Sequence, residues 1–159
     1  MYLDALSFLE DERDAWRPYE ALDELTDEQL ARPVDGAGGW SGRDLIGHLV
    51  AWQEISLAAA RELAVGETSA TLERVDAEWA ARGDALNGEY LAAWSELPMA
   101  QVRERFRTVP GELRGYLTVV PESRWVKHRT TLGSFIRKTF EHYDDHRPDL
   151  DAILGSARS

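Results

Sequence analysis

Four segments of this chain place apolar residues three and four positions apart, the spacing that lines one face of an α-helix. These segments cover residues 2–25, 41–65, 98–120 and 131–153. No segment alternates apolar and polar residues for long, so β-strands are not expected. Residues 67–95 form a long connection between the second and third segments, and Gly83 and Gly88 interrupt its short helical stretches. The pattern predicts an all-α protein, a four-helix bundle that forms a single domain over residues 1–159.

Local signals locate the start of the second helix and a bend in the first. Ser41 is an expected N-cap, and Asp44 follows three residues later, where its carboxylate favours the positive end of a helix. Trp40 and Leu45 occupy the two positions of a hydrophobic staple. Pro18 is expected to kink the first helix, because proline has no backbone N–H to donate.

Three of the four histidines lie on the inner faces of predicted helices. His142 and His146 are four residues apart, so they lie one turn apart on one face of the last helix. His48 lies about 10 Å from the start of the second helix, and His146 lies about 10 Å from the end of the last one. The imidazoles therefore meet at one level if these two helices are antiparallel. The long connection at 67–95 favours that arrangement, because it suits a crossover that leaves the third helix parallel to the second.

Three converging imidazoles predict a site for one divalent metal ion, with His48, His142 and His146 as ligands. Cysteine is absent, so no thiolate competes for the ion. Neutral imidazole suits zinc, nickel, iron or copper. A site with three protein ligands also leaves positions for water or substrate, as catalytic sites do. The alternative is that the histidines are core residues with satisfied hydrogen bonds.

Other polar residues near these histidines are weaker candidates. Asp145 and Asp149 each follow a candidate ligand by three residues, so either could orient that ligand, although a solvated acidic helix face is the favoured interpretation. Glu54 points about 120° away from His48 around the helix and is a poor candidate for a general base. His128 lies in a loop before the last helix and is expected at the surface.

Several aromatic residues permit two interpretations each. Trp52 lies one turn after His48, where core packing is favoured over a role as a pocket wall. Trp79, Tyr90 and Trp94 could line a ligand site or a dimer face, or they could cover the side of the bundle. The sequence does not choose between these alternatives.

The charge of the chain bears on its partners. Lysine and arginine number 18 against 29 aspartates and glutamates, a net charge of −11. Such a field repels nucleic acid and anionic membranes, and no basic cluster offsets it. No apolar run of about 18 residues exists, so no membrane span is expected. The first residues lack the basic and apolar regions of a signal peptide, and the expected location is the cytoplasm.

Two stretches resemble signatures of the DinB-like four-helix bundle superfamily. One runs from Gly39 to Trp52 and the other from Thr139 to His146. The sequence at 132–135 and the tryptophan-rich connection further resemble the ClbS/DfsB-like branch. The resemblance implies an up-down-down-up bundle and a divalent metal, often nickel or zinc with iron possible, held by the three histidines named above. Members include thiol-dependent S-transferases and isomerases and proteins that protect against genotoxins, and homodimers are common among them.

Three functions follow from these observations. The first is an enzyme whose metal activates a small thiol or a water for attack on an electrophilic small molecule, as an S-transferase, isomerase or hydrolase. The second is a protein that binds and sequesters a toxic small molecule without turnover. The third is a helical module whose histidines are core residues and hold no metal.

Overall fold

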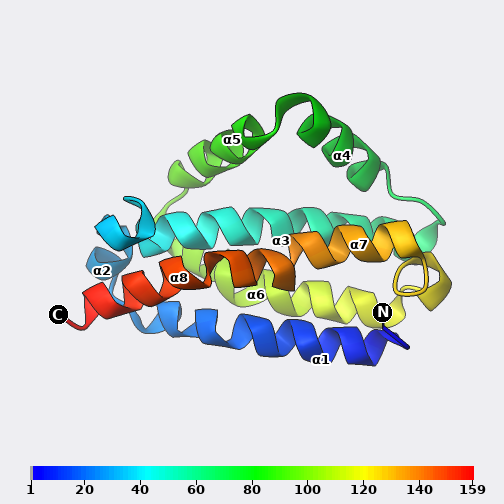
Figure 1. Ribbon diagram of the computed structural model, residues 1–159, viewed down its shortest axis with the longest axis horizontal. Helices are drawn as coiled ribbons and strands as arrows, with labels where there is room; N and C mark the ends of the chain where they lie inside the picture. The colour runs from blue at the N-terminus through cyan, green and yellow to red at the C-terminus, as the bar shows by residue number, and fades with distance from the viewer. Residues whose placement is uncertain (1) are drawn as a thin grey trace.

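The computed structural model describes residues 2–159, and every regular element within them is a helix. Four long helical rods lie side by side (Figure 1). They are α1 (Ala5–Trp16), α3 (Gly42–Val65), α6 (Met99–Val119), and α7 (Arg129–Lys138) followed by α8 (Phe140–Ala157). In Figure 1 α3 and α6 run in one direction, and α1 and the α7–α8 rod run in the other. This order confirms the up-down-down-up bundle and the antiparallel relation between the second and last rods.

The helix starts follow the local chemistry of their capping residues. Ser41 Oγ accepts a hydrogen bond from the Asp44 amide at 3.1 Å, and Asp44 Oδ2 accepts one from the Ser41 amide at 3.0 Å. Thr26 and Gln29 form the same reciprocal capping box at the start of the short helix α2 (Asp27–Ala31). Each box satisfies two backbone donors that the first turn of a helix leaves without partners.

The first rod is shorter as an α-helix than its apolar spacing predicts. The helix expected over 2–25 ends at Trp16, and the chain continues as a 3-10 helix, Arg17–Glu24. Pro18 lies at the start of this second element, where its missing N–H removes an α-helical hydrogen bond. Two further 3-10 turns, Asp35–Ala37 and Glu122–Arg124, link the rods.

The last rod is two helices rather than the single helix that the sequence predicts. Thr139 separates α7 from α8, with φ −118° and ψ −112°. Its hydroxyl donates to the Phe135 carbonyl at 2.7 Å, and its amide instead reaches the Ile136 carbonyl at 3.3 Å. The side chain thus takes the acceptor that the amide would use in a continuing helix, as hydroxyl residues can do.

The long connection is more ordered than expected. It consists of α4 (Ala70–Arg82) and α5 (Asp84–Ser95), where the sequence indicates only a turn or two of helix at two places. The two helices form an arch beside α3 (Figure 1), and Gly83, with φ +55°, makes the corner between them.

Apolar contacts hold the arch on α3. Val75 and Leu86 pack with Trp52 in a small cluster under it. At its far end, a Cβ atom on Gly47 would lie 3.0 Å from Trp94 Cβ, so only glycine allows α5 to come this close to α3. Within the described residues no helix is long and apolar enough to span a membrane.

Candidate metal centre

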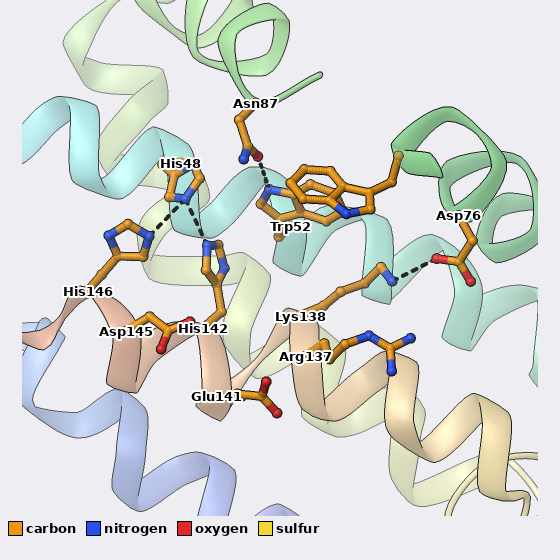
Figure 2. Close-up of a pocket in the computed structure, with 11 residues that line it drawn as sticks. His48, Trp52, Asp76, Asn87, Arg137, Lys138, Glu141, His142, Asp145 and His146 are labelled. Atoms are coloured by element: carbon orange, nitrogen blue, oxygen red, sulfur yellow. Dashed lines mark hydrogen bonds and ion pairs between the residues drawn. The ribbon is translucent and has the colours of Figure 1, made fainter. Parts of the chain in front are cut away.

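The three predicted histidines meet between α3 and α8 (Figure 2). His142 Nε2 lies 2.8 Å from His48 Nε2, and His146 Nε2 lies 3.1 Å from the same atom. One ring nitrogen from each residue falls within 4.8 Å of the other two. His48 comes from α3, and the other two come from successive turns of α8, which runs antiparallel to α3 (Figure 1). The helix geometry worked out from the sequence therefore brings the rings together, while their role as metal ligands stays a prediction.

One acidic residue orients a histidine from behind. His146 Nδ1 lies 2.9 Å from Asp149 Oδ2. This contact favours the tautomer with the proton on Nδ1, so the lone pair of Nε2 faces the other two rings. The solvated-face interpretation is therefore wrong for Asp149, while Asp145 lines the neighbouring pocket.

Trp40 covers the histidines on another side. Its ring is stacked on His146, with centroids 5.6 Å apart and planes 17° apart, and it lies 4.9 Å from the His48 ring. The sequence indicates only a helix-entry role for this residue. The contact could not be read from spacing, because it depends on how the chain before Ser41 turns toward α8.

The electrostatics keep two of the imidazoles neutral. Burial, and then the charge of His146, lower the pKa of His48 to about 4. Burial, and then the charges of His48 and His146, lower the pKa of His142 to about 3. At neutral pH these two rings therefore offer lone pairs rather than positive charge.

This donor set fits a divalent ion. Two nitrogens that bind one ion at about 2.1 Å lie about 3.0 Å apart at right angles and about 3.4 Å apart at the tetrahedral angle. The two Nε2–Nε2 distances, 2.8 and 3.1 Å, lie near the lower of these values. The Nδ1 atom of His142 is buried and has no hydrogen-bond partner among the described residues. A metal ion bound at the Nε2 atoms would leave this Nδ1 without a partner as well, so the fit of a divalent ion rests on the three converging Nε2 atoms.

A cavity of about 580 Å³ opens beside the histidines. Its walls come from α3, the arch, and the junction of α7 with α8. The lining residues are His48, Trp52, Asp76, Trp79, Asn87, Arg137, Lys138, Glu141, His142, Asp145 and His146. Residues on both sides of the break at Thr139 line the cavity, so the break lies at the cavity wall.

Comparison with known proteins identifies the family. Residues 9–138 match the family model described as the mycothiol maleylpyruvate isomerase N-terminal domain. The chain belongs to this family. It is a DinB-like four-helix family, which confirms the superfamily that the sequence motifs indicate. Neither the curated proteins nor the solved structures gave a match.

The family match covers the site only in part. It includes His48 and the arch, and it ends at Lys138, before His142 and His146. The place of these two histidines in the site therefore rests on the geometry of α8. The ClbS/DfsB-like branch stays a prediction.

The aromatic residues divide between core and cavity. Trp52 is buried, yet it also lines the cavity, and its Nε1 donates to Asn87 Oδ1 at 2.7 Å. Trp79 lies edge-on to Trp52 at 5.8 Å, is 44% exposed and lines the cavity. Tyr90 supports Trp52 from another side at 5.6 Å, and Trp94 is buried in the bundle core.

Two residues that the sequence indicates as weaker candidates lie outside the cavity. Glu54 pairs with Arg105 Nη1 at 3.5 Å and does not line the cavity. His128 is exposed, as expected. It also has a local role that the sequence did not indicate, because its Nδ1 accepts the Thr131 amide at 3.3 Å and caps α7.

Proposed function

We propose that this chain binds one divalent metal ion through His48, His142 and His146 and acts as a thiol-dependent transferase or isomerase. The convergence of three Nε2 atoms from two antiparallel helices supports the proposal most directly. Nickel and zinc are the expected metals, with iron possible, because imidazole nitrogen suits all three.

The family description supports the thiol part of the proposal. It names mycothiol, a small thiol, and an isomerase. A divalent ion with three protein ligands has room for a further ligand and, when bound, lowers the pKa of a coordinated thiol or water. The co-substrate is then an electrophilic small molecule that enters the adjoining cavity.

The chain's own residues would position and shield the reacting groups. Asp149 fixes the His146 ring so that its Nε2 faces the centre. Trp40 covers this ring and His48, which limits the access of water from that side. Trp52 and Trp79 offer an apolar wall for the body of a substrate.

Sequestration without turnover is the second candidate. The cavity of about 580 Å³ is within the size range of small-molecule sites, so tight binding alone could be its role. Incubation of the metal-loaded protein with a thiol and an electrophile separates the two candidates. Catalytic loss of the electrophile supports the enzyme, and saturable binding at one equivalent supports sequestration.

The direct test of the metal site is metal analysis of purified, metal-supplemented protein. We expect about one ion per chain in the wild type, because the three imidazoles supply a complete protein ligand set. His142→Ala should lower this to below about 0.1. His128→Ala is the matched control, because it removes an exposed histidine outside the cavity and should retain the ion. Equal metal content in both variants would contradict the proposal.

Two further expectations belong to this proposal. A homodimer is expected from the resemblance, and analytical ultracentrifugation tests it. A cytoplasmic location is the second expectation, and fractionation of cells that express the protein tests it.

A further inference from the structure

The end of the cavity away from the histidines carries two cationic side chains. Arg137 and Lys138 lie in the last turn of α7 and both line the cavity. Figure 2 shows both side chains extending away from the three histidines; Lys138 reaches Asp76 on the arch, and Arg137 lies along α7. The proposed metal chemistry uses neither residue.

Lys138 is held in place within the cavity wall. The residue is only 6% exposed, and its Nζ donates to Ser134 Oγ at 2.7 Å and lies 3.2 Å from Asp76 Oδ1. Burial lowers the pKa of Lys138, and the Asp76 carboxylate opposes this effect. The contact with Asp76 also ties α7 to the arch, so Lys138 has a structural role as well as a charge that faces the cavity.

Arg137 has no such structural partner. Its guanidinium forms no hydrogen bond or ion pair with any residue from 2 to 159. The side chain is exposed and folds back over Gly133, where an added Cβ would lie 3.3 Å from Arg137 Nη1. A guanidinium presents its donors as a planar fork that matches a carboxylate, and this fork is available at the edge of the cavity.

The other charged residues that line the cavity are acidic. Glu141 and Asp145 line it on the α8 side, close to the histidines (Figure 2). Asp76 lies at the arch, where Lys138 is its partner. An anionic group is therefore repelled from the middle of the cavity and is accommodated best at the Arg137 end.

We propose that Arg137 and Lys138 form a subsite for the carboxylate of the electrophilic substrate. The planar or apolar body of that substrate lies along Trp52 and Trp79, and its reactive carbon faces the histidines. The position of the reactive carbon rests on the proposed function. The carboxylate subsite itself does not, because it needs no metal.

A matched pair of probes tests the subsite. Benzoate and benzamide have the same ring and nearly the same size, but only benzoate carries the charge. Binding to the metal-loaded protein is measured by ligand-observed NMR titration. We expect benzoate to bind at least about tenfold more tightly than benzamide, as a charge-assisted bidentate contact would provide.

Variants then assign the preference to Arg137. Arg137→Gln should reduce the preference for benzoate to less than about threefold, and Arg137→Lys should restore part of it, since lysine keeps the charge without the fork. Arg147→Gln is the matched control, because this exposed arginine pairs with Asp151 outside the cavity. An unchanged preference in Arg137→Gln, or an equal loss in Arg147→Gln, would overturn the subsite.

A third variant separates this inference from the proposed function. In His142→Ala the preference for benzoate should persist, because the subsite contains no metal ligand. If His142→Ala loses the preference while Arg137→Gln keeps it, the carboxylate binds the metal and the subsite is refuted. If the wild type holds no metal but still prefers benzoate through Arg137, the proposed metal chemistry fails and the subsite stands.

Discussion

The contact between Asp149 and His146 provides a specific test of how the metal centre is built. The Asp149 carboxylate accepts the Nδ1 proton of His146 at 2.9 Å, and the two side chains are only 28% and 21% exposed. Asp149→Asn keeps the size of the side chain but replaces a charged acceptor with an amide. The amide oxygen is a weaker acceptor, and the amide NH₂ group would favour the wrong tautomer if it faced the ring.

The expected magnitude follows from the role of this contact. Loss of a residue that orients a metal ligand lowers metal affinity by about tenfold to a hundredfold. This corresponds to about 1.4–2.7 kcal/mol of binding free energy. Because the contact is partly exposed, the loss of metal-binding free energy in Asp149→Asn is expected in the lower half of this range. The loss in Asp149→Ala should be larger than that in Asp149→Asn.

Chelator competition with a fluorescent zinc indicator measures the affinity, and urea unfolding of the metal-free protein measures stability. Asp151→Asn is the control, because it makes the same charge change on the same helix and removes only an exposed pair with Arg147. Asp149→Asn should lose metal affinity with little change in the stability of the metal-free protein. Equal affinities in the Asp149 and Asp151 variants would refute the orienting role.

Two further perturbations test the packing and the electrostatics. The pKa values of His48 and His142 are about 4 and about 3 in the folded protein, against 6.5 when unperturbed, so the unfolded state binds more protons between these values. His48 alone should cost the metal-free protein up to about 3 kcal/mol of stability as pH falls from 7 to 4, and His142 should add to this loss. Constant stability by urea unfolding would contradict this. Gly47→Ala places a Cβ 3.0 Å from Trp94 Cβ and should lower the free energy of unfolding by about 1–3 kcal/mol. Gly155→Ala is the control, because its Cβ meets nothing within 4 Å and should not be destabilising. Equal melting temperatures for the two variants would refute the close approach of α5 to α3.

Much of the fold was predictable because it depends on short-range patterns. Apolar spacing located the four rods, and the residues at Ser41 and Asp44 located the start of α3. The long connection implied that α3 and α6 are parallel, which in turn placed His48 level with the α8 histidines. On antiparallel helices, the level of each residue along the bundle follows from counting helical turns. The convergence of the three histidines was therefore also predictable.

The remaining features depend on competition or on tertiary contacts. The break at Thr139 arises because a hydroxyl competes with a backbone amide for the Phe135 carbonyl, and nothing in the apolar spacing reports that competition. The arch depends on its packing against Trp52 and on the absence of a side chain at Gly47. The helix α5 has weak apolar periodicity of its own, so tertiary packing rather than pattern defines it.

The residues that surround the three histidines were the least predictable part of the site. Asp149 was visible three residues after His146, but a solvated carboxylate and an orienting one have the same spacing in sequence. Trp40, Asn87 and Arg137 reach the site from segments whose positions are set only by the folded chain. A sequence pattern can therefore propose ligands on helices, while the groups that orient them require coordinates.

The most direct test of the metal centre is a crystal structure of the metal-supplemented protein with anomalous diffraction at the metal edge. The proposal predicts one anomalous peak between α3 and α8, within about 2.0–2.2 Å of the Nε2 atoms of His48, His142 and His146. It also predicts at least one coordination position filled by water or a small ligand rather than by protein. Supplemented crystals with no anomalous peak among the three rings, or with a peak held by other residues, would contradict it.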